Sequence, residues 1–267
     1  MIPPAVVTAI VFAYGLVLGS FLNVVIHRLP REMSLWRPRS HCPACGALVR
    51  WFDNVPVLSF LWLRGRCRRC RAPISWRYPL VELATATLLA LVHHRHGLSV
   101  PAAEAAVLVL LLVPLGLIDL DHHLLPDVLT VPGIGLGLAG AAVEGWLLQP
   151  PEQRLAPLLD AAAGAALGAA IPSLVILVYW WLRGKEGMGW GDVKLLAMLG
   201  AFLGWRGMLM SLMLGATAGG AVGLVLMATG RGKADTALPF GSFLCAAGLV
   251  VMLWAPQLAH LLGWHLP

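Results

Sequence analysis

Long apolar runs, separated by short polar segments, dominate the pattern of this chain. Several runs reach about 20 residues, the length of a helix that crosses the hydrocarbon core of a bilayer. No run has the two-residue alternation of a barrel strand, so helices are the form that satisfies the backbone in lipid. The pattern predicts an all-α, polytopic membrane protein with eight transmembrane helices. The predicted spans are residues 5–26, 80–95, 101–119, 126–148, 157–182, 192–204, 207–229 and 238–263.

The composition agrees with this pattern. Of the 267 residues, 59% are hydrophobic and only 12% are charged, whereas a soluble domain carries about 25% charged residues. The first residues, Met1-Ile-Pro-Pro, have no basic region and no cleavage site of small residues follows them. We therefore expect the first apolar run to be a retained helix and not a cleaved signal.

Positive charge is concentrated in one segment. Residues 27–78 hold eleven arginines and two acids, a net charge of +9, while the rest of the chain has a net charge of −3. The positive-inside rule places this segment in the cytoplasm and the N-terminus outside. Orientation and anionic lipid headgroups explain the arginines without nucleic-acid binding. Eight spans then place the loops 119–126, 183–191 and 230–237 at the cytoplasmic face as well.

The same pattern predicts the domain organisation. Residues 1–26 form a first transmembrane helix, residues 27–78 form a cytoplasmic insert, and residues 79–267 form a seven-helix membrane domain. We expect the lipid bilayer to be a partner over most of the chain.

Two CxxC pairs lie inside the basic segment, and each lets two thiolates reach one metal ion. A closed site of four thiolates favours tetrahedral zinc, and an insert of about 50 residues needs such a staple because its core is small. Disulfides, an iron–sulfur centre or a redox dithiol are alternatives, although a reducing compartment disfavours disulfides. The fifth cysteine, Cys245, falls in the last apolar run and is expected to be a small buried residue. The four predicted metal ligands are Cys42, Cys45, Cys67 and Cys70.

Two aspartates lie at the ends of apolar runs. Asp119 closes one run, and Asp192 follows the glycine-rich turn 187–191 and opens another. A carboxylate at membrane depth costs roughly 2.5–3.5 kcal/mol, so each is a candidate functional residue. Two carboxylates that share a site divide the roles of acid and base, which is the chemistry of peptide hydrolysis without a covalent intermediate. Spacing alone leaves a second interpretation open, in which both acids pack helices or relay ions.

Three further charged residues surround this pair in the sequence. Asp127 follows Pro126 at a helix start, where an acid serves as a cap or as a partner of the helix dipole. Asp121 fits a structural, a substrate-positioning or a catalytic role. Lys194 lies two residues after Asp192 and so faces another direction on the helix, which leaves Asp192 without a neutralising neighbour.

Five motifs in order resemble the bacterial type IV prepilin peptidases, which are GxGD-type intramembrane aspartyl proteases. The resemblance extends from about residue 5 to residue 263. The motifs are Gly19-Ser-Phe-Leu-Asn23-Val-Val-Ile-His27-Arg28-Leu-Pro, the paired CxxC sequences, Arg77-Tyr-Pro-Leu-Val-Glu82, the cluster from Leu117-Ile-Asp119 to Leu-Pro-Asp127, and Gly189-Trp-Gly191-Asp192-Val-Lys194.

This resemblance implies a location, the inner (cytoplasmic) membrane of a bacterium, and an activity. Such enzymes remove the basic leader of type IV prepilins and type II secretion pseudopilins on the cytoplasmic side, after a glycine. Many then methylate the new N-terminal amine with S-adenosylmethionine. By motif match Asp119 and Asp192 are the catalytic pair, and the zinc-binding insert is linked to methylation. No glycine-rich nucleotide fingerprint is present, so the sequence assigns no site to the methyl donor. The alternative function is a transporter or proton relay that uses the buried aspartates.

Overall fold

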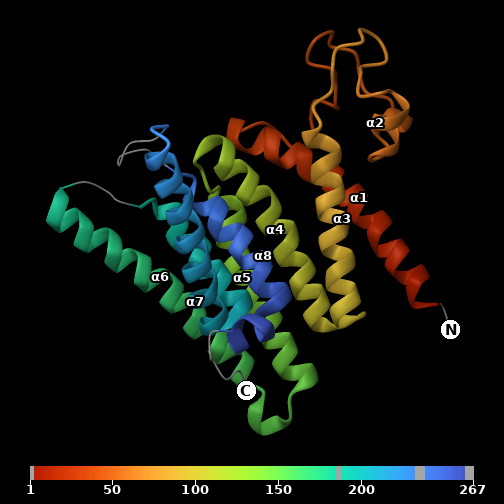
Figure 1. The fold of residues 1–267 in the computed structure, drawn as a ribbon. Coiled ribbons are helices and arrows are strands. Elements are labelled where there is room, and N and C mark those ends of the chain that lie inside the picture. Colours follow the sequence, from red (N-terminus) through yellow and green to blue (C-terminus); the bar gives the residue numbers. More distant parts are fainter. Residues whose placement is uncertain (1–2, 185–187, 232–237, 262–267) are drawn as a thin grey trace. The chain divides into compact units, whose positions relative to one another are not determined.

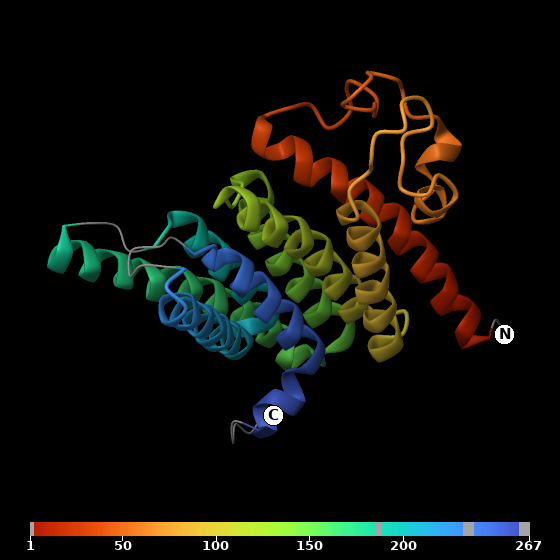
Figure 2. The ribbon, with the colours of Figure 1, turned by 45° about the horizontal axis from the view of Figure 1, so that its top comes forward.

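The computed structural model describes residues 3–184, 188–231 and 238–261, and within these ranges the chain is helical with two isolated β-bridges. Lys185, Glu186 and Gly187 of the glycine-rich segment, and Lys233 of the last predicted cytoplasmic loop, lie outside the described residues. The chain divides into two compact units, Met1–Leu98 and Ser99–Pro267. Figures 1 and 2 show the helices of both units.

The first unit consists of two long helices and the insert between them. Helix α1 (Pro4–Arg28) packs against α3 (Arg77–His96), and the crossing is close because α1 carries glycines on this side. A β-carbon at Gly19 would lie 2.7 Å from the Cα atom of Glu82. The insert holds the short helices η1 (Leu29–Arg31), η2 (Trp51–Asn54) and α2 (Leu58–Trp62).

Polar side chains of the first unit bind backbone groups of neighbouring elements. The Asn23 amide on α1 donates to the carbonyl of Tyr78 at 3.1 Å, and the Glu82 carboxylate on α3 accepts the N–H of Val57 at 2.8 Å. These bonds give a structural reason for two of the sequence motifs, since they fix α3 against α1 and the insert against α3.

The second unit is a helical bundle. Helix α8 packs against both α4 and α7, and α7 also packs against α5 and α6. Its core is formed by fully buried residues of α4, α7 and α8, among them Leu112, Leu199 and Leu244. The helices are α4 (Val100–His122), α5 (Asp127–Leu148), α6 (Ala156–Arg183), α7 (Trp190–Ala228) and α8 (Phe240–Leu261), with the short helix η3 (Pro151–Gln153) before α6.

Helix α7 is interrupted at Gly204, whose φ of 67° and ψ of 177° are not helical. The break falls between the predicted spans 192–204 and 207–229, so the two predicted helices are present as the two parts of α7. With α1, α3, α4, α5, α6 and α8 they give the eight predicted segments.

Six described helices are long and apolar enough to cross a membrane: α1 with η1, α4, α5, η3 with α6, α7 and α8. Helix α3, with 20 residues, is not among them, and its last turn carries three histidines and Arg95. The prediction of an all-α, multi-pass membrane protein with a cysteine insert after its first helix is confirmed.

Candidate active site and metal centre

Asp119 lies near the C-terminal end of α4 and is buried, with 5% of the residue exposed. Its Oδ2 atom accepts a hydrogen bond from the backbone N–H of Ser242 at 2.6 Å, and Oγ of Ser242 lies 3.0 Å from the same oxygen. Ser242 is in the first turn of α8, where backbone N–H groups lack partners within the helix. The start of α8 therefore stabilises a negative charge that the C-terminal end of α4 disfavours.

Ser242 is a residue of this site that the sequence did not indicate. Its Oγ also lies 2.8 Å from the carbonyl of Gly116, one turn before Asp119 on α4. A hydroxyl has a single proton, so Oγ donates to either the Gly116 carbonyl or the Asp119 carboxylate. A lone serine in an apolar run carries no motif, and only the folded chain brings it to Asp119.

Asp192 lies in the first turn of α7 and is 8% exposed. Its N–H donates to the carbonyl of Gly189 at 3.1 Å, which closes the turn at the start of this helix. Gly191 gives room to a neighbouring loop residue, because a β-carbon there would lie 3.0 Å from Cβ of Leu125. The glycine at this position is explained by close packing.

The fold brings the two predicted aspartates into one region. The charge of Asp119 acts on the Asp192 carboxyl, and both charges act on the buried thiol of Cys245 on α8. Gly241, next to Ser242, lies close to Asp119, since a β-carbon there would be 3.0 Å from the Asp119 carboxyl carbon. Cys245 is 2% exposed, which confirms its predicted burial. Two buried carboxyl groups in electrostatic contact suit acid/base chemistry.

Lys194, two residues after Asp192, does not neutralise this pair. Lys194 forms an ion pair with Asp127, with its Nζ 2.7 Å from both carboxylate oxygens. Its side chain therefore points to α5 and, as predicted, in a different direction from that of Asp192. Asp127 is the first residue of α5 and makes no side-chain cap. The side-chain cap considered for Asp127 is therefore not formed, because its carboxylate pairs with Lys194, whereas its place in the first turn of α5 agrees with the role of dipole partner. Asp121 is exposed at the end of α4.

The four cysteines of the insert form one cluster. Their sulfur atoms all lie within 4.8 Å of one another, and the Sγ atoms of Cys42 and Cys70 are 3.8 Å apart. Tetrahedral zinc with Zn–S bonds of about 2.3 Å requires sulfur separations of about 3.8 Å. The cluster therefore fits a single metal ion held by one CxxC pair from each side.

The two CxxC segments have the same backbone structure. In the first, Cys42 N–H donates to Ala47 and its carbonyl accepts from Gly46; in the second, Cys67 and Ala72 repeat the pattern. Backbone N–H groups of Cys70 and Arg69 lower the pKa of the Cys67 thiol to about 6, whereas desolvation and the neighbouring cysteines raise the pKa of the Cys70 thiol to about 11. A thiolate is the form that binds metal, so the backbone around Cys67 favours ligation by this residue.

Fold and site together define a multi-pass membrane protein with a buried aspartate pair and a four-cysteine centre. Two family models match the chain: "Bacterial Peptidase A24 N-terminal domain" over residues 13–96 and "Type IV leader peptidase family" over residues 106–224. With the relatives described next, these matches show that the chain belongs to the type IV leader peptidase family.

Three similar proteins are each named "Prepilin leader peptidase/N-methyltransferase". The protein from Pseudomonas putida is 39% identical over 96% of this chain and 93% of its own length. That from Burkholderia pseudomallei (strain 1026b) is 40% identical over 98% of this chain and 90% of its own length. That from Myxococcus xanthus (strain DK1622) is 48% identical over 82% of this chain, which covers only 63% of that relative. No solved structure matches.

Proposed function

We propose that this protein is an intramembrane aspartyl endopeptidase that removes the leader of type IV prepilins and type II secretion pseudopilins, after a glycine. The observation that carries the proposal is the meeting of Asp119 and Asp192, two buried acids from the ends of α4 and α7. The names of the similar proteins supply the substrate class, since each is called a prepilin leader peptidase.

The mechanism follows from a proton shared by two acids. The ionised carboxylate takes a proton from water, and the resulting hydroxide attacks the carbonyl carbon of the scissile peptide. The protonated carboxyl donates its proton to the carbonyl oxygen, which stabilises the tetrahedral intermediate. Collapse of this intermediate breaks the C–N bond, and the new amine takes a proton from the site. No covalent enzyme intermediate forms. Ser242 holds the Asp119 carboxylate in place through this cycle.

The topology suits such a substrate. A prepilin has a basic leader in the cytoplasm and an apolar helix in the bilayer, so its scissile bond lies at the inner face of the membrane. The +9 charge of residues 27–78 assigns the insert, Asp119 and Asp192 to the cytoplasmic side of the inner membrane by the positive-inside rule. We assign residues 1–26 to a first span, 27–78 to a cytoplasmic domain and 79–267 to the peptidase domain.

We further assign zinc to the four-cysteine cluster, with Cys42, Cys45, Cys67 and Cys70 as ligands. The observed sulfur separations support a tetrahedral thiolate site. The role of the ion is structural, because four protein ligands leave no open position. The second activity is methylation of the new N-terminal amine, with S-adenosylmethionine as the methyl donor, and the names of the similar proteins support it.

Substitution of either aspartate tests the peptidase. We expect Asp119→Asn and Asp192→Asn each to lower leader removal by more than about 1,000-fold, because an amide can neither take nor give the proton that the reaction requires. Purified protein is incubated with a prepilin, and the product is identified by mass spectrometry. Asp127→Asn is the matched control. Asp127 is an exposed acid that pairs with Lys194, and we expect this variant to retain activity. Undiminished cleavage by either of the two buried variants would refute the assignment.

A transporter or proton relay is the weaker candidate. Both buried aspartates lie at helix ends, whereas the sites of secondary transporters lie near the middle of the bilayer. The matched family models describe peptidases. A proton flux into proteoliposomes that depends on Asp119 and Asp192 in the absence of prepilin would favour the relay.

A further inference from the structure

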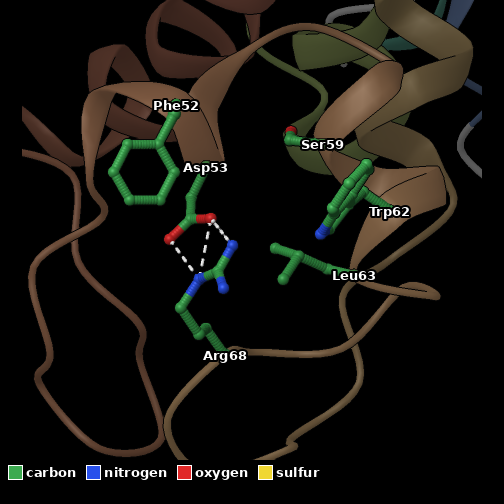
Figure 3. A pocket seen from close by; sticks show the side chains of 6 residues that line it. All are labelled: Phe52, Asp53, Ser59, Trp62, Leu63 and Arg68. Carbon is green, nitrogen blue, oxygen red and sulfur yellow. Dashed lines mark hydrogen bonds and ion pairs between the residues drawn. The ribbon is translucent and has the colours of Figure 1, made fainter.

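The insert contains a cavity that the peptidase does not use. It has a volume of about 340 Å³ and lies entirely within the first unit (Figure 3). Three segments form it: η2, the end of α2 with the residue that follows, and the second CxxC segment. The residues that line it are Phe52, Asp53, Ser59, Trp62, Leu63 and Arg68.

One wall of the cavity is an ion pair that presents a cation. Arg68 donates to Asp53 through Nε, 3.0 Å from each carboxylate oxygen, and through Nη2 at 2.6 Å. Three of the five guanidinium N–H groups are not used by these bonds. The Arg68 side chain is 45% exposed and that of Asp53 only 10%. The aspartate therefore fixes the guanidinium, and the guanidinium offers donors to a ligand.

The other walls are aromatic. Trp62 is 84% exposed and Phe52 is 40% exposed, and the Arg68 guanidinium carbon lies 5.4 Å from the centre of the Phe52 ring. Figure 3 shows Trp62 and Phe52 on different sides of the Asp53–Arg68 pair. Exposed aromatic faces stack on flat heteroaromatic rings and attract cations. Ser59 adds a hydroxyl that can donate or accept.

We propose that this cavity binds S-adenosylmethionine, the methyl donor of the second activity. The proposal rests on the proposed methyl transfer and gives it a location. The α-carboxylate of the donor matches Arg68, its adenine and sulfonium match the aromatic walls, and its ribose hydroxyls match Ser59. The volume is within the range of small-molecule sites, which is roughly 300–1,000 Å³.

The competing occupant is the basic leader of the substrate, which meets electrostatic opposition here. Residues 27–78 carry a net charge of +9, and the more exposed member of the ion pair in the cavity wall is Arg68. S-adenosylmethionine has a net charge of about +1 and carries a carboxylate that Arg68 attracts, whereas a lysine- or arginine-rich peptide carries several positive charges and is repelled more strongly. The chemistry of the wall thus favours the methyl donor.

The cavity is also connected to the metal centre by the chain. Arg68 lies between Cys67 and Cys70, so the second CxxC segment places its side chain. We therefore expect metal removal to weaken binding of the donor as well as to loosen the insert. This connection gives a physical reason for a metal-stapled insert to serve methylation.

Binding of radiolabelled S-adenosylmethionine to the purified full chain, measured by equilibrium dialysis, tests the proposal. We expect Trp62→Ala and Arg68→Gln each to raise Kd at least tenfold. The matched controls are Trp36→Ala, a tryptophan of the same insert that is 81% exposed, and Arg69→Gln, the neighbour of Arg68; neither lines the cavity, and both keep Kd within twofold. Zinc content is measured on every variant, so that a loss of the metal centre is recognised.

The possible outcomes separate the cavity from the peptidase. Wild-type Kd in both cavity variants overturns the proposal, as does an absence of binding by wild-type protein at saturating donor. Equal weakening in the two controls also overturns it. If Arg68→Gln loses zinc, Trp62→Ala alone decides. Cleavage of a prepilin by the same wild-type sample is scored separately, so a failure of the peptidase leaves the binding result intact.

Discussion

At the scale of single residues, the two aspartates differ in how the fold holds them. Asp192 lies at the N-terminal end of its helix, where the dipole favours a negative charge, whereas Asp119 lies near a C-terminal end. The first turn of α8 compensates for this by aiming the N–H and hydroxyl of Ser242 at the Asp119 carboxylate. The two aspartates come from two helices, α4 and α7, but the site also includes Ser242 from a third helix, α8.

Removal of the Ser242 hydroxyl tests this positioning role. A hydrogen bond to a charged group contributes about 1.5–3 kcal/mol, and the backbone N–H remains in the variant. We expect Ser242→Ala to lower kcat for leader removal about tenfold with little change in KM. Ser211→Ala is the matched control, since this buried hydroxyl donates only to the carbonyl of Gly207 in its own helix. Equal rates for the two variants would remove Ser242 from the site.

The residues of the site were predictable to different degrees. Asp119, Asp192 and the four cysteines could be identified because charge in an apolar run and a paired CxxC are rare and have few explanations. Ser242 could not, because serine is common in membrane helices and its partner lies 123 positions away. Asp127 was assigned a capping role from its place after Pro126, and a tertiary contact with Lys194 replaced that local bond.

At the scale of elements, α7 depends on the conformation of one glycine. Gly204 has a φ of 67° and divides the helix, and the carboxylate of Asp160 on α6 occupies the space where its β-carbon would lie. The hydrophobic pattern predicted the break, since it separated residues 192–204 from 207–229. It could not predict the non-helical φ and ψ that Gly204 adopts at the break.

Substitution of this glycine should be costly. We expect Gly204→Ala to lower the free energy of unfolding by about 1–3 kcal/mol, from the disfavoured φ together with the clash with Asp160. The comparison is Gly220→Ala, a helical glycine of α7 with no atom within 4 Å of its added β-carbon. This control is expected to be neutral or stabilising. Unfolding of the two variants is followed by circular dichroism in mixed micelles. An equal loss of stability in both variants would contradict the interpretation.

The insert is the element that the proposed zinc ion would stabilise most. We expect Cys42→Ser to abolish stoichiometric zinc binding and to expose the insert to protease, because a small domain of this kind obtains its folding free energy from the ion. Ala44→Ser, a change inside the same CxxC segment that removes no ligand, is the control. Metal content by mass spectrometry and limited proteolysis give the two readouts. A zinc-free wild-type protein would end the assignment.

At the scale of the whole molecule, orientation follows from charge. We propose that eight crossings place the loop at Gly97 outside and Gly230 inside, which would put both aspartates at the cytoplasmic face. This arrangement requires α3 to cross the membrane, although its composition is less apolar than that of the six other long helices. The sequence could not settle α3, because its histidine-rich last turn suits both a span and an interfacial helix.

Reporter fusions test this orientation. Alkaline phosphatase, which is active only outside the cytoplasm, should be active after Gly97 and inactive after Gly230. If α3 does not cross, the fusion after Gly97 is inactive instead. That result would move Asp119 to the outer face and would remove the proposed access of the pair to a leader held in the cytoplasm.

Because Arg68 lies within the second CxxC segment, the proposed metal site and the proposed methyl-donor site share one stretch of chain. If the four thiolates hold zinc and the cavity holds the methyl donor, as proposed, oxidants that attack the thiolates would also displace Arg68, while the two buried carboxyl groups are chemically inert to them. A cell under oxidative stress would then accumulate pilins that are trimmed but carry an unmodified amine. The ratio of methylated to unmethylated mature pilin would in effect record the redox history of the cell.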